Sequence, residues 1–475
     1  MISTASPDLA SSGLLRKMPE MSAFRTLGRS QAWILLALTV GLVLSLRAAA
    51  LPTLIAVNAL STLAYALVLA YGVLWFVKGL APVRLVSVSD EEARTMPESQ
   101  LPVYTVLVAA YREAAVIAET IKALESLDYP VSRMEIKLLL EADDTETIAA
   151  ARAAAPAPHI EIVEVPYSPP RTKPKACNYG LQFARGQLVT LFDAEDRPDP
   201  LQLRRAAVAF ARLDPSVACL QAKLHYHNPD QNFITRLFAA EYITWFARML
   251  PALSGMAAPI PLGGTSMHIR RDVLDRVGAW DPHNVTEDAD LGVRLNRLGY
   301  RTLILDSVTY EEANSDFINW IKQRSRWYKG YLQTWLVHMR DPARLWHELG
   351  PLGFIGLNAV VGATPIVALL NPVLWLLFLA WFAGRLGLVQ ALFPAWVLYP
   401  AVACALLGNA LALVRTAVSV RAAGHTELLP WLLLMPIYWM MMSLAAIRAL
   451  AQLLVSPWHW EKTTHGLSPV ATRSG

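Results

Sequence analysis

Five apolar runs without a charged residue constrain this chain more than any other feature of its sequence. They cover residues 33–46, 54–77, 351–384, 386–414 and 428–447. Apolar runs of about 18 residues or more are typical of membrane-spanning helices. The chain has 475 residues, of which 54% are apolar and only 17% are charged, and this is rare for a single soluble domain. The sequence therefore predicts that segments on both sides of the middle of the chain lie in a lipid bilayer.

A charged segment of roughly 270 residues separates the two sets of apolar runs and has the size of a soluble domain. Basic residues precede the first run, at Arg16, Lys17, Arg25 and Arg29. Because Lys and Arg favour the cytoplasmic side of a membrane, this segment and the soluble domain are predicted to be cytosolic. The first ~30 residues are polar, and no small-residue cleavage site stands where a signal peptide would have one, so no cleavable signal peptide is expected.

The number of spans depends on the third apolar run. Residues 351–384 are long for one helix and contain Asn371-Pro372, a dipeptide typical of turns. A tight hairpin at that point gives six spans with both termini inside, and this is the preferred prediction. One kinked helix gives five spans. Arg415 and Arg421 favour five, because six spans place these two charges outside.

Charge and cysteine content exclude several functions. A net charge of +4, scattered along the chain, is too small to indicate binding to nucleic acid. Cys177, Cys219 and Cys404 lack the spacing of a metal site or a disulfide framework. We expect these cysteines to be reduced, as they are in a cytosolic protein.

The soluble segment alternates between strand-like and helix-like patterns. Residues 104–110 are apolar and partly β-branched, as in a buried parallel strand, and Ile117, Ile121, Leu124 and Leu127 follow at helical spacing. The segments MEIKLLLEADD and GQLVTLFDAEDRPDP repeat this design, with acidic residues at the carboxyl end of each strand. The alternation predicts an open α/β sheet that binds its ligand at the carboxyl ends of the strands.

Acidic residues gather where that ligand is expected. Asp193 and Glu195 are two positions apart at a strand end, so both carboxylates can face one crevice, where they repel unless a cation lies between them. A hard divalent ion shared with substrate phosphates fits this pair, and a solvated turn is the alternative. The acids of EADD, residues 141–144, either accept hydrogen bonds from a ribose or base or cap the next helix. Lys173 and Lys175 either bind a diphosphate or lie in an ordinary surface loop.

The segment NVTEDADLGVRL contains another helix start. Thr286 is placed to cap this helix, and acidic residues in its first turn, Glu287 and Asp290 among them, favour the helix dipole. This structural role is sufficient to explain both acids. A carboxylate at a helix start beside a crevice can equally act as a general base.

The segment WIKQRSRWYKGYLQTW, which begins at Trp320, mixes aromatic and basic residues. On a helical wheel, Gln323, Arg326 and Trp327 share a face that lies roughly 150° from an apolar stripe. The stripe consists of Phe317, Ile321, Tyr328, Leu332, Trp335 and Met339. The pattern predicts a helix on the membrane surface, with its stripe toward lipid and the other face toward the soluble domain. A plain interfacial helix is the alternative. On the domain-facing side, a guanidinium suits a phosphate, and an indole suits stacking on a sugar ring.

Taken together, these motifs resemble those of the membrane-integrated, inverting family 2 glycosyltransferases, which include synthases of cellulose, hyaluronan, poly-N-acetylglucosamine and β-glucans. The matching segments occur in the family's order between residues 103 and 330: VAAYRE, EADD, KPKACNYG, FDAED, GGTSMHIRR, TEDADLGVRL and QRSRW. Each segment is weak alone, but the ordered set is specific. The resemblance implies a GT-A fold with a mixed, mainly parallel sheet, a UDP-sugar donor, and Mg²⁺ or Mn²⁺ as cofactor.

The resemblance also implies roles for individual residues. Asp288 is the implied general base, and Asp193 and Glu195 are the implied metal ligands. FDAED has Asp-Ala-Glu where the family has Asp-x-Asp, so Asp196 rivals Glu195 as a ligand. The residues implied to bind the donor nucleotide are Tyr111, Glu113, Asp143, Asp144, Lys175, Asp193 and Arg326. Those implied to bind the acceptor are Gly264, Thr265, Glu287, Gln323 and Trp327.

The segment SPWHWEKTTHG follows the last apolar run and is similar to the gating segments of this family. Trp460, Lys462 and Thr463 are its predicted gating residues, with His465 as a further candidate. A tail at the membrane border with aromatic anchors is the alternative.

The predicted organisation has six parts. They are a cytoplasmic segment (1–30), two membrane helices (31–78), a GT-A catalytic domain (79–315), an interface helix (316–345), four membrane helices (351–456) and a cytosolic tail with the gating segment (457–475). The expected location is a bacterial-type inner (plasma) membrane, crossed several times, with the catalytic domain in the cytosol.

The predicted function is a processive β-glycosyltransferase that polymerises a UDP-sugar, preferably UDP-glucose, and secretes the glycan through its membrane helices. The alternative is a membrane glycosyltransferase that adds one or a few sugars to a lipid. A transporter or a non-catalytic membrane subunit fits the hydropathy but leaves the ordered acids unexplained. The expected partners are the donor, a glycan acceptor and the lipid bilayer, and the sequence leaves the donor sugar, the linkage and the oligomeric state open.

Overall fold

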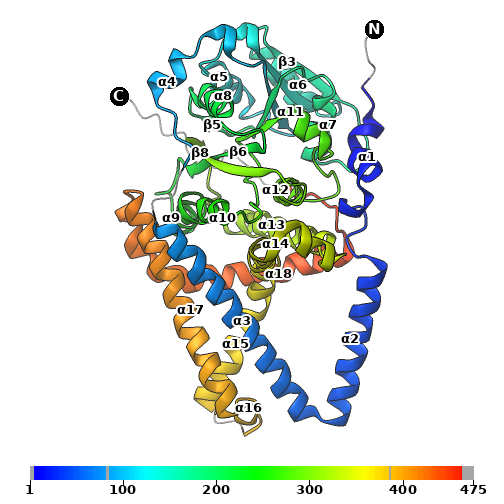
Figure 1. Cartoon of the computed structure of the whole chain (residues 1–475), viewed down its shortest axis with the longest axis vertical. Coiled ribbons are helices and arrows are strands. Elements are labelled where there is room, and N and C mark those ends of the chain that lie inside the picture. The colour runs from blue at the N-terminus through cyan, green and yellow to red at the C-terminus, as the bar shows by residue number, and fades with distance from the viewer. Residues whose placement is uncertain (1–4, 82–84, 385–386, 463–475) are drawn as a thin grey trace.

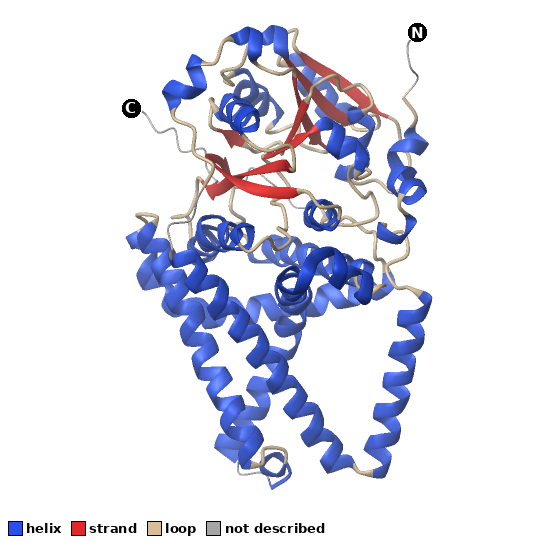
Figure 2. Ribbon diagram, in the orientation of Figure 1, coloured by secondary structure: helices blue, strands red, loops and turns tan. Residues whose placement is uncertain are grey.

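The computed structural model of the protein describes residues 5–81, 85–384 and 387–462. A domain built on a β-sheet forms one end of the molecule, and long helices extend away from it at the other end (Figure 1, Figure 2). Shorter or crosswise helices lie between these two parts. They are α9 (Phe233–Thr244), α10 (Leu250–Gly255), α12 (Glu287–Arg297), α13 (Phe317–His338), α14 (Pro342–Leu357) and α18 (Met435–Val455).

The sheet contains eight strands in the order β3-β2-β1-β4-β7-β6-β8-β5. β3, β2, β1 and β4 are parallel neighbours, and β6 is parallel to β8. The short β7 pairs antiparallel with β4 and β6, and β5 pairs antiparallel with β8. The predicted mixed, mainly parallel sheet is therefore confirmed. The strands are β1 (Tyr104–Ala110), β2 (Met134–Glu141), β3 (Ile160–Val165), β4 (Leu188–Phe192), β5 (Arg197–Pro198), β6 (Val217–Tyr226), β7 (Met267–Arg270) and β8 (Arg301–Glu311).

Both faces of the central strands are buried, which explains why these strands are continuous apolar runs in the sequence. In β1, Leu107 joins one hydrophobic cluster, while Val106 and Val108 join another. Residues of both clusters also come from helices packed against the sheet. The helices of this domain that precede α12 include α4 (Asp90–Thr95), α5 (Ile117–Glu125), α6 (Thr145–Ala153), α7 (Lys173–Leu181), α8 (Gln202–Arg212) and α11 (Arg271–Arg276).

The described residues contain five helices that are long and apolar enough to cross a membrane, by length and composition. They are Arg29–Ala48, Ala50–Leu80, Pro342–Ala383, Ala395–Ala422 and Thr426–Val455. The first of them, α2, has 20 residues and none is buried. At 1.5 Å per residue it is about 30 Å long, which matches the hydrocarbon core of a bilayer. These helices indicate association with a membrane.

The predicted hairpin at Asn371-Pro372 is wrong, and with it the preferred count of six spans. α15 (Ala363–Gly384) runs through both residues as one helix. The Tyr65 hydroxyl of α3 (Ala50–Leu80) donates to the Val367 carbonyl at 3.2 Å and also bonds the Asn371 side chain. Polar contacts from a neighbouring helix allow a proline to remain inside an apolar helix.

The arrangement of the last helices also differs from the four membrane helices predicted for residues 351–456. α17 (Ala395–Ala422) leads back to the sheet domain, so Arg421 in its last turn lies on the domain side (Figure 1). This removes the conflict that the six-span prediction created for Arg415 and Arg421. α2, α3, α15 and α17 run lengthwise, whereas α18 lies crosswise below α13 and α14 (Figure 1).

The prediction that the apolar stripe of α13 faces lipid is wrong. The stripe packs against other helices. Tyr328 packs with Ala368 of α15 and with Ala445 and Ala449 of α18. Trp335 donates a hydrogen bond from Nε1 to Asn358 Oδ1 at 2.9 Å. The stripe is therefore mostly a helix–helix interface, which holds α13 between the sheet domain and the long helices.

Gly330 allows α13 to approach the start of α12 closely. A Cβ atom at this position would lie 2.3 Å from Thr286 Oγ1, well inside van der Waals contact. Thr286 precedes α12, although its side chain makes no capping hydrogen bond to that helix. The missing side chain of Gly330 therefore sets the distance between α13 and the acidic first turn of α12.

We expect Gly330→Ala to lower the free energy of unfolding by about 1–3 kcal/mol, the usual cost of forcing extra atoms into a packed interior. Thermal unfolding of the purified protein in detergent measures this as a lower Tm. Gly255→Ala is the matched control, because a Cβ at that helical glycine meets no heavy atom within 4 Å. Equal Tm values for the two variants would contradict a tight contact between α12 and α13.

Candidate active site

Residues at the carboxyl ends of β1, β2, β4 and β8 line one cavity of about 270 Å³. α7, α9, α12, α13, the loop that contains Gly263 and Gly264, and the C-terminal tail, residues 456–462, also contribute to its wall. Most of the predicted site residues line this cavity, although they come from segments far apart in the sequence. They are Tyr111, Glu113, Asp193, Glu195, Gly264, Glu287, Asp288, Gln323, Arg326, Trp327, Trp460 and Lys462. We call it the catalytic cavity because the predicted general base, Asp288, is one of these residues.

Asp143 and Asp144 do not line the cavity but contact residues of its wall or of the adjoining loop. Asp143 forms an ion pair of 2.6 Å with Arg171, which does line the cavity. Asp144 caps α6, accepting a hydrogen bond from the Thr147 amide at 3.3 Å, and it also accepts one from the Arg112 amide. Arg112 has a positive φ of 56°, which few non-glycine residues adopt. Asp144 therefore holds the loop that carries Tyr111 and Glu113. It is also a helix cap, which is the alternative that the sequence left open for the EADD segment.

Lys175 does not line the cavity, although it was predicted to bind the donor. Its side chain is buried in α7 and forms an ion pair of 2.8 Å with Glu141. Lys173 lines the cavity instead. Residues two positions apart on a helix point in directions about 200° apart, so only one of the two lysines can face the cavity.

Thr265 and Asp196 are buried next to Asp193 and do not line the cavity. Asp196 Oδ2 accepts a hydrogen bond from the Asp193 amide at 2.7 Å and another from the Thr265 hydroxyl. Burial raises the pKa of Asp196 well above its usual range, and the charges of Asp193 and Glu195 add to this effect. Asp196 does not line the cavity, so the geometry favours Glu195 as the partner of Asp193. Thr463 lies outside the described residues.

Lys173 lies at the centre of an acidic cluster. Its Nζ bonds the Asp193 carboxylate and donates to the Gly264 carbonyl at 2.9 Å. Burial opposes its charge, but the charges of Asp193 and Glu287 outweigh this effect and raise the pKa of Lys173. Glu311, at the end of β8, also lines the cavity. Burial and the charges of Asp196, Asp193 and Glu195 raise the pKa of Glu311 well above its usual range. The cavity thus attracts cations strongly.

Asp193 and Glu195 fit a hard divalent cation that is only partly enclosed by protein. The described residues contain no group of three or more His, Cys, Asp and Glu side chains that could hold a metal ion. Mg²⁺ and Mn²⁺ are commonly held by one or two carboxylates together with water and substrate phosphates. Two carboxylates open to a cavity meet that requirement, and the Lys173 ammonium on Asp193 shows that a cation is favoured there.

The first turn of α12 presents two neighbouring carboxyl groups to the cavity. Asp288 Oδ1 accepts a hydrogen bond from the Ala289 amide at 2.7 Å. Gly264, with φ +82°, approaches it so closely that a Cβ there would lie 2.8 Å from Asp288 Oδ2. Burial raises the pKa of Asp288 to about 6, while the Ala289 amide and the Lys173 charge lower it in part. Burial and the Asp288 charge raise the pKa of Glu287 to about 8.

α13 presents Gln323, Arg326 and Trp327 to the cavity, which is the face that helical spacing places opposite its stripe. Gln323 is oriented by Asn314, whose Nδ2 donates to Gln323 Oε1 at 2.8 Å. Burial lowers the pKa of Arg326, although the charges of Glu287 and Asp193 oppose the shift. The Trp327 ring is nearly parallel to that of Tyr242, with centroids 6.2 Å apart. The face therefore combines a cation with an aromatic platform.

The tail reaches into the cavity beside the loop of Tyr111. The Arg326 guanidinium lies over the Trp460 ring, 4.6 Å from its centroid. Lys462 Nζ is 3.0 Å from Glu113 Oε1 and donates to the Arg112 carbonyl at 2.7 Å. The tail thus covers the part of the cavity that lies between α13 and the carboxyl end of β1.

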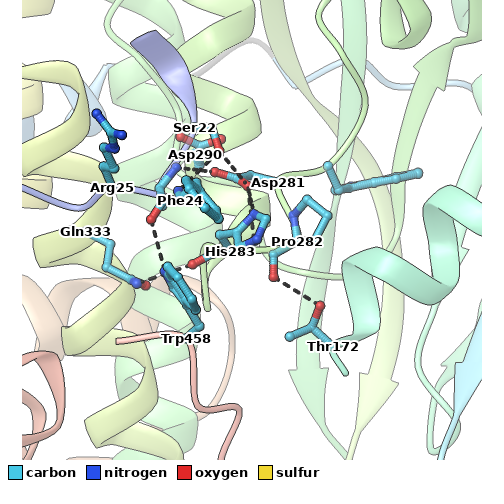
Figure 3. A network of polar contacts seen from close by, with 12 residues as sticks. Ser22, Phe24, Arg25, Thr172, Asp281, Pro282, His283, Asp290, Gln333 and Trp458 are labelled. Carbon is cyan, nitrogen blue, oxygen red and sulfur yellow. Dashed lines mark hydrogen bonds and ion pairs between the residues drawn. The ribbon is translucent and has the colours of Figure 1, made fainter. Parts of the chain in front are cut away.

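Residues near the other end of the chain hold this tail in place (Figure 3). Trp458 donates from Nε1 to the Ala23 carbonyl at 3.2 Å and stacks on Phe24, with ring centroids 5.4 Å apart. The His283 ring packs edge-on against Phe24 and Trp458, with centroid distances of 5.0 and 5.3 Å. Figure 3 shows these three side chains together, and we call them the tail anchor. It joins the segment before α2, the loop before α12 and the tail.

Sequence reasoning missed several residues of the cavity. Glu311 follows an apolar strand in the same way as Asp193, so the rule of acids at strand ends would have found it. Arg171 contacts the Tyr111 hydroxyl at 2.7 Å, and Tyr242 lies beneath Trp327, but no pattern in the sequence marks either residue. The tail anchor depends on residues from three distant segments and has no local signature.

Comparison with known proteins identifies the class of the sheet domain. Residues 102–330 match the family described as Glycosyltransferase like family 2. Beta-monoglucosyldiacylglycerol synthase of Synechocystis is 29% identical over 287 residues, which are 58% of this chain and 57% of the relative. Glucomannan 4-beta-mannosyltransferase 2 of Arabidopsis thaliana is 27% identical over 247 residues, which are 50% of this chain and 45% of the relative. The chain thus spans about half the length of the curated relatives it matches.

A solved structure supports the fold. Mannosyltransferase PcManGT from Pyrobaculum calidifontis, determined in complex with GDP-Man and Mn²⁺, is similar with a TM-score of 0.56 and 21% identity. The similarity covers 85% of this chain and 99% of that chain. The sheet domain therefore has a GT-A-like fold and is a glycosyltransferase family 2-like domain.

We expect Glu287→Gln to stabilise the protein at alkaline pH. The pKa of Glu287 is raised to about 8 in the folded protein, above the usual value of a glutamate, so ionisation favours the unfolded state. The stability of the natural protein should therefore fall as the pH rises from about 5 to about 8, and glutamine should remove part of that fall. Tm measured across this range should rise in the variant by more at pH 8 than at pH 5.

The exposed Glu119→Gln is the control for this experiment, because Glu119 lies on the solvent side of α5. A Tm gain for Glu287→Gln that is the same at pH 5 and pH 8 would contradict the electrostatic cause.

We expect Trp458→Ala to release the tail. Aromatic pairs contribute about 0.5–1.5 kcal/mol beyond burial, so tail opening should increase, and trypsin should cleave after Lys462 roughly two- to tenfold faster. Limited digestion followed by mass spectrometry measures this rate. Trp396→Ala is the matched control, because Trp396 is exposed in the first turn of α17. Unchanged cleavage in Trp458→Ala would show that the tail anchor does not hold the tail.

Proposed function

We propose that this protein is a membrane glycosyltransferase that uses a nucleoside-diphosphate sugar, a UDP-sugar, as donor. It transfers the sugar to an acceptor hydroxyl with inversion at C1. The observation that carries this proposal is the convergence of Asp193, Asp288 and Arg326 on one cavity next to long apolar helices. The names of the relatives, which are a glucosyldiacylglycerol synthase and a mannosyltransferase, support the same reaction type.

The donor has a consistent place in the catalytic cavity. Tyr111, whose hydroxyl is held by Arg171, lies at the end of β1 and suits the nucleoside. Lys173 and Arg326 supply positive charge for the diphosphate. A divalent ion held by Asp193 and Glu195 would neutralise charge on the leaving diphosphate when bound. Trp460 and Lys462 lie over this region, which suits a segment that encloses the nucleotide.

Asp288 is placed to act as the general base. Its pKa of about 6 leaves it ionised at neutral pH and still basic enough to accept a proton. It takes the proton of the acceptor hydroxyl as the oxygen forms a bond to C1 of the donor sugar. The bond between C1 and the diphosphate oxygen breaks, and the nucleoside diphosphate leaves from the opposite face. Activity should therefore fall as the pH drops below about 6.

The acceptor that the structure favours is a lipid. α13 and α9, which carry Trp327 and Tyr242, pack directly on α18 and α17, so the acceptor side of the cavity adjoins the apolar helices. In the space between α3, α15 and α17, the polar side chains of Thr62, Thr364 and Asn409 bond to carbonyls of their own helices and not to the open space. This favours addition of sugar to a membrane lipid on the cytosolic side over export of a polymer.

A processive synthase remains the second candidate function. The Trp327 and Tyr242 rings form a stacked platform that suits the terminal sugar of a growing chain. The relative named a glucomannan mannosyltransferase is consistent with this second function. The length of the product distinguishes the two candidates.

The test uses the full chain purified in detergent with Mg²⁺ or Mn²⁺, labelled UDP-glucose, UDP-galactose, UDP-N-acetylglucosamine and GDP-mannose, and a lipid extract as acceptor. We expect one donor to give a labelled glycolipid on thin-layer chromatography. Asp288→Asn should lower the rate by roughly a hundredfold or more, the scale of general-base catalysis. Glu119→Gln should leave the rate unchanged.

Two results would contradict the proposal. Transfer by Asp288→Asn at the natural rate would remove the assigned base. A long labelled polymer that forms without lipid would replace the lipid acceptor by the processive alternative.

A further inference from the structure

A second cavity, of about 380 Å³, lies among the long helices. Residues of α3, α15, α17 and α18 line it, together with Tyr328 of α13. α17 lines it from Leu398 to Arg415, a stretch of about 25 Å at 1.5 Å per residue. This length is close to the thickness of a hydrocarbon core, so the cavity follows the direction of a lipid chain.

The polar side chains of this cavity are mostly bonded within the helices. Thr62 and Thr364 donate to carbonyls one turn earlier, at 2.9 and 2.6 Å, and Asn409 does so at 2.6 Å. Tyr65 and Asn371 bond each other. A sugar chain needs hydrogen-bonding partners along its path, whereas a hydrocarbon chain needs none. The lining therefore favours an acyl chain as the occupant.

Arg415 lies at the end of this cavity that is nearer the sheet domain. Its guanidinium is over the Trp75 ring, 5.0 Å from the centroid, and Trp75 belongs to the same buried cluster as Phe246 and Leu250. No acidic side chain among residues 5–81, 85–384 and 387–462 forms an ion pair with Arg415. A partly buried guanidinium beside an apolar space is costly unless an anion approaches it. The second cavity thus combines a hydrocarbon-like lining with one unpaired cation at its domain end.

We propose that this cavity binds a phospholipid whose acyl chains fill the apolar part and whose anionic headgroup contacts Arg415. The headgroup then lies at the level where the helices meet the sheet domain. Tyr328, which lines this cavity, directly follows Trp327 of the catalytic cavity, so the lipid binds beside the acceptor platform. The site is defined by binding alone and does not depend on the reaction proposed above.

The test is a binding measurement on the full chain, delipidated in detergent and without any sugar donor. Native mass spectrometry with phosphatidylglycerol and with diacylglycerol gives the affinity for each lipid. Arg415→Gln should weaken phosphatidylglycerol binding roughly tenfold, the scale of a hydrogen bond to a charged group, and leave diacylglycerol binding unchanged. Arg421→Gln, on the same helix but in its exposed last turn, should bind phosphatidylglycerol as the natural protein does.

A second pair of variants tests the apolar part of the site. Gly408 lines the cavity, and a Cβ there meets no heavy atom within 4 Å, so Gly408→Leu fills the cavity without a clash at the backbone. It should reduce phosphatidylglycerol binding at least as much as Arg415→Gln. Gly41→Leu is the matched control, because Gly41 of α2 has equally open surroundings and lies away from the cavity.

The proposal is overturned if Arg415→Gln and Arg421→Gln bind phosphatidylglycerol equally, or if Gly408→Leu binds it as Gly41→Leu does. It is also overturned if a soluble oligosaccharide competes with the lipid, which would make the cavity a sugar path. The Gly408 arm is decisive by itself if Arg415→Gln fails to fold, as judged by size-exclusion chromatography and Tm.

Discussion

Repulsion among carboxyl groups is the constraint on which the rest of the catalytic cavity depends. Asp193, Glu195, Glu287, Asp288 and Glu311 line a single space of about 270 Å³. Like charges this close cannot all be ionised without a compensating cation. Lys173 on α7 and Arg326 on α13 supply that charge, so the packing of these two helices against the acidic strand ends is an electrostatic necessity as well as a hydrophobic one. The Gly330 contact keeps α13 near enough for Arg326 to do this.

The same repulsion explains why the site favours an incoming cation. Burial raises the pKa of Asp288 and of Glu287, and the charge of Asp288 raises that of Glu287 further. Such a site costs stability in the absence of ligand, which is common where function requires perturbed groups.

Local patterns predicted the elements and the positions of acids, because both depend on short-range rules. The rule of acids at strand ends pointed to Asp193, and helical spacing turned Arg326 and Trp327 toward the domain, whereas Asp288 came from the family resemblance. All four line one cavity. The choice between Lys173 and Lys175 required the rotation of α7, which only packing determines. The turn signal of Asn371-Pro372 failed because Tyr65, about 300 positions earlier in the chain, bonds to that helix. The stripe of α13 was assigned to lipid because the sequence does not show that α18 lies crosswise beneath it.

The hydrogen bond from Trp458 to the Ala23 carbonyl joins residues 435 positions apart. Chains are synthesised from the amino terminus, and domains fold as they emerge from the ribosome. The sheet domain can therefore be synthesised long before Trp458. Phe24 and His283 then lack the third ring of the tail anchor. Closure of the tail over the loop of Tyr111 therefore comes late in assembly, because it requires residues that follow α18 in the chain.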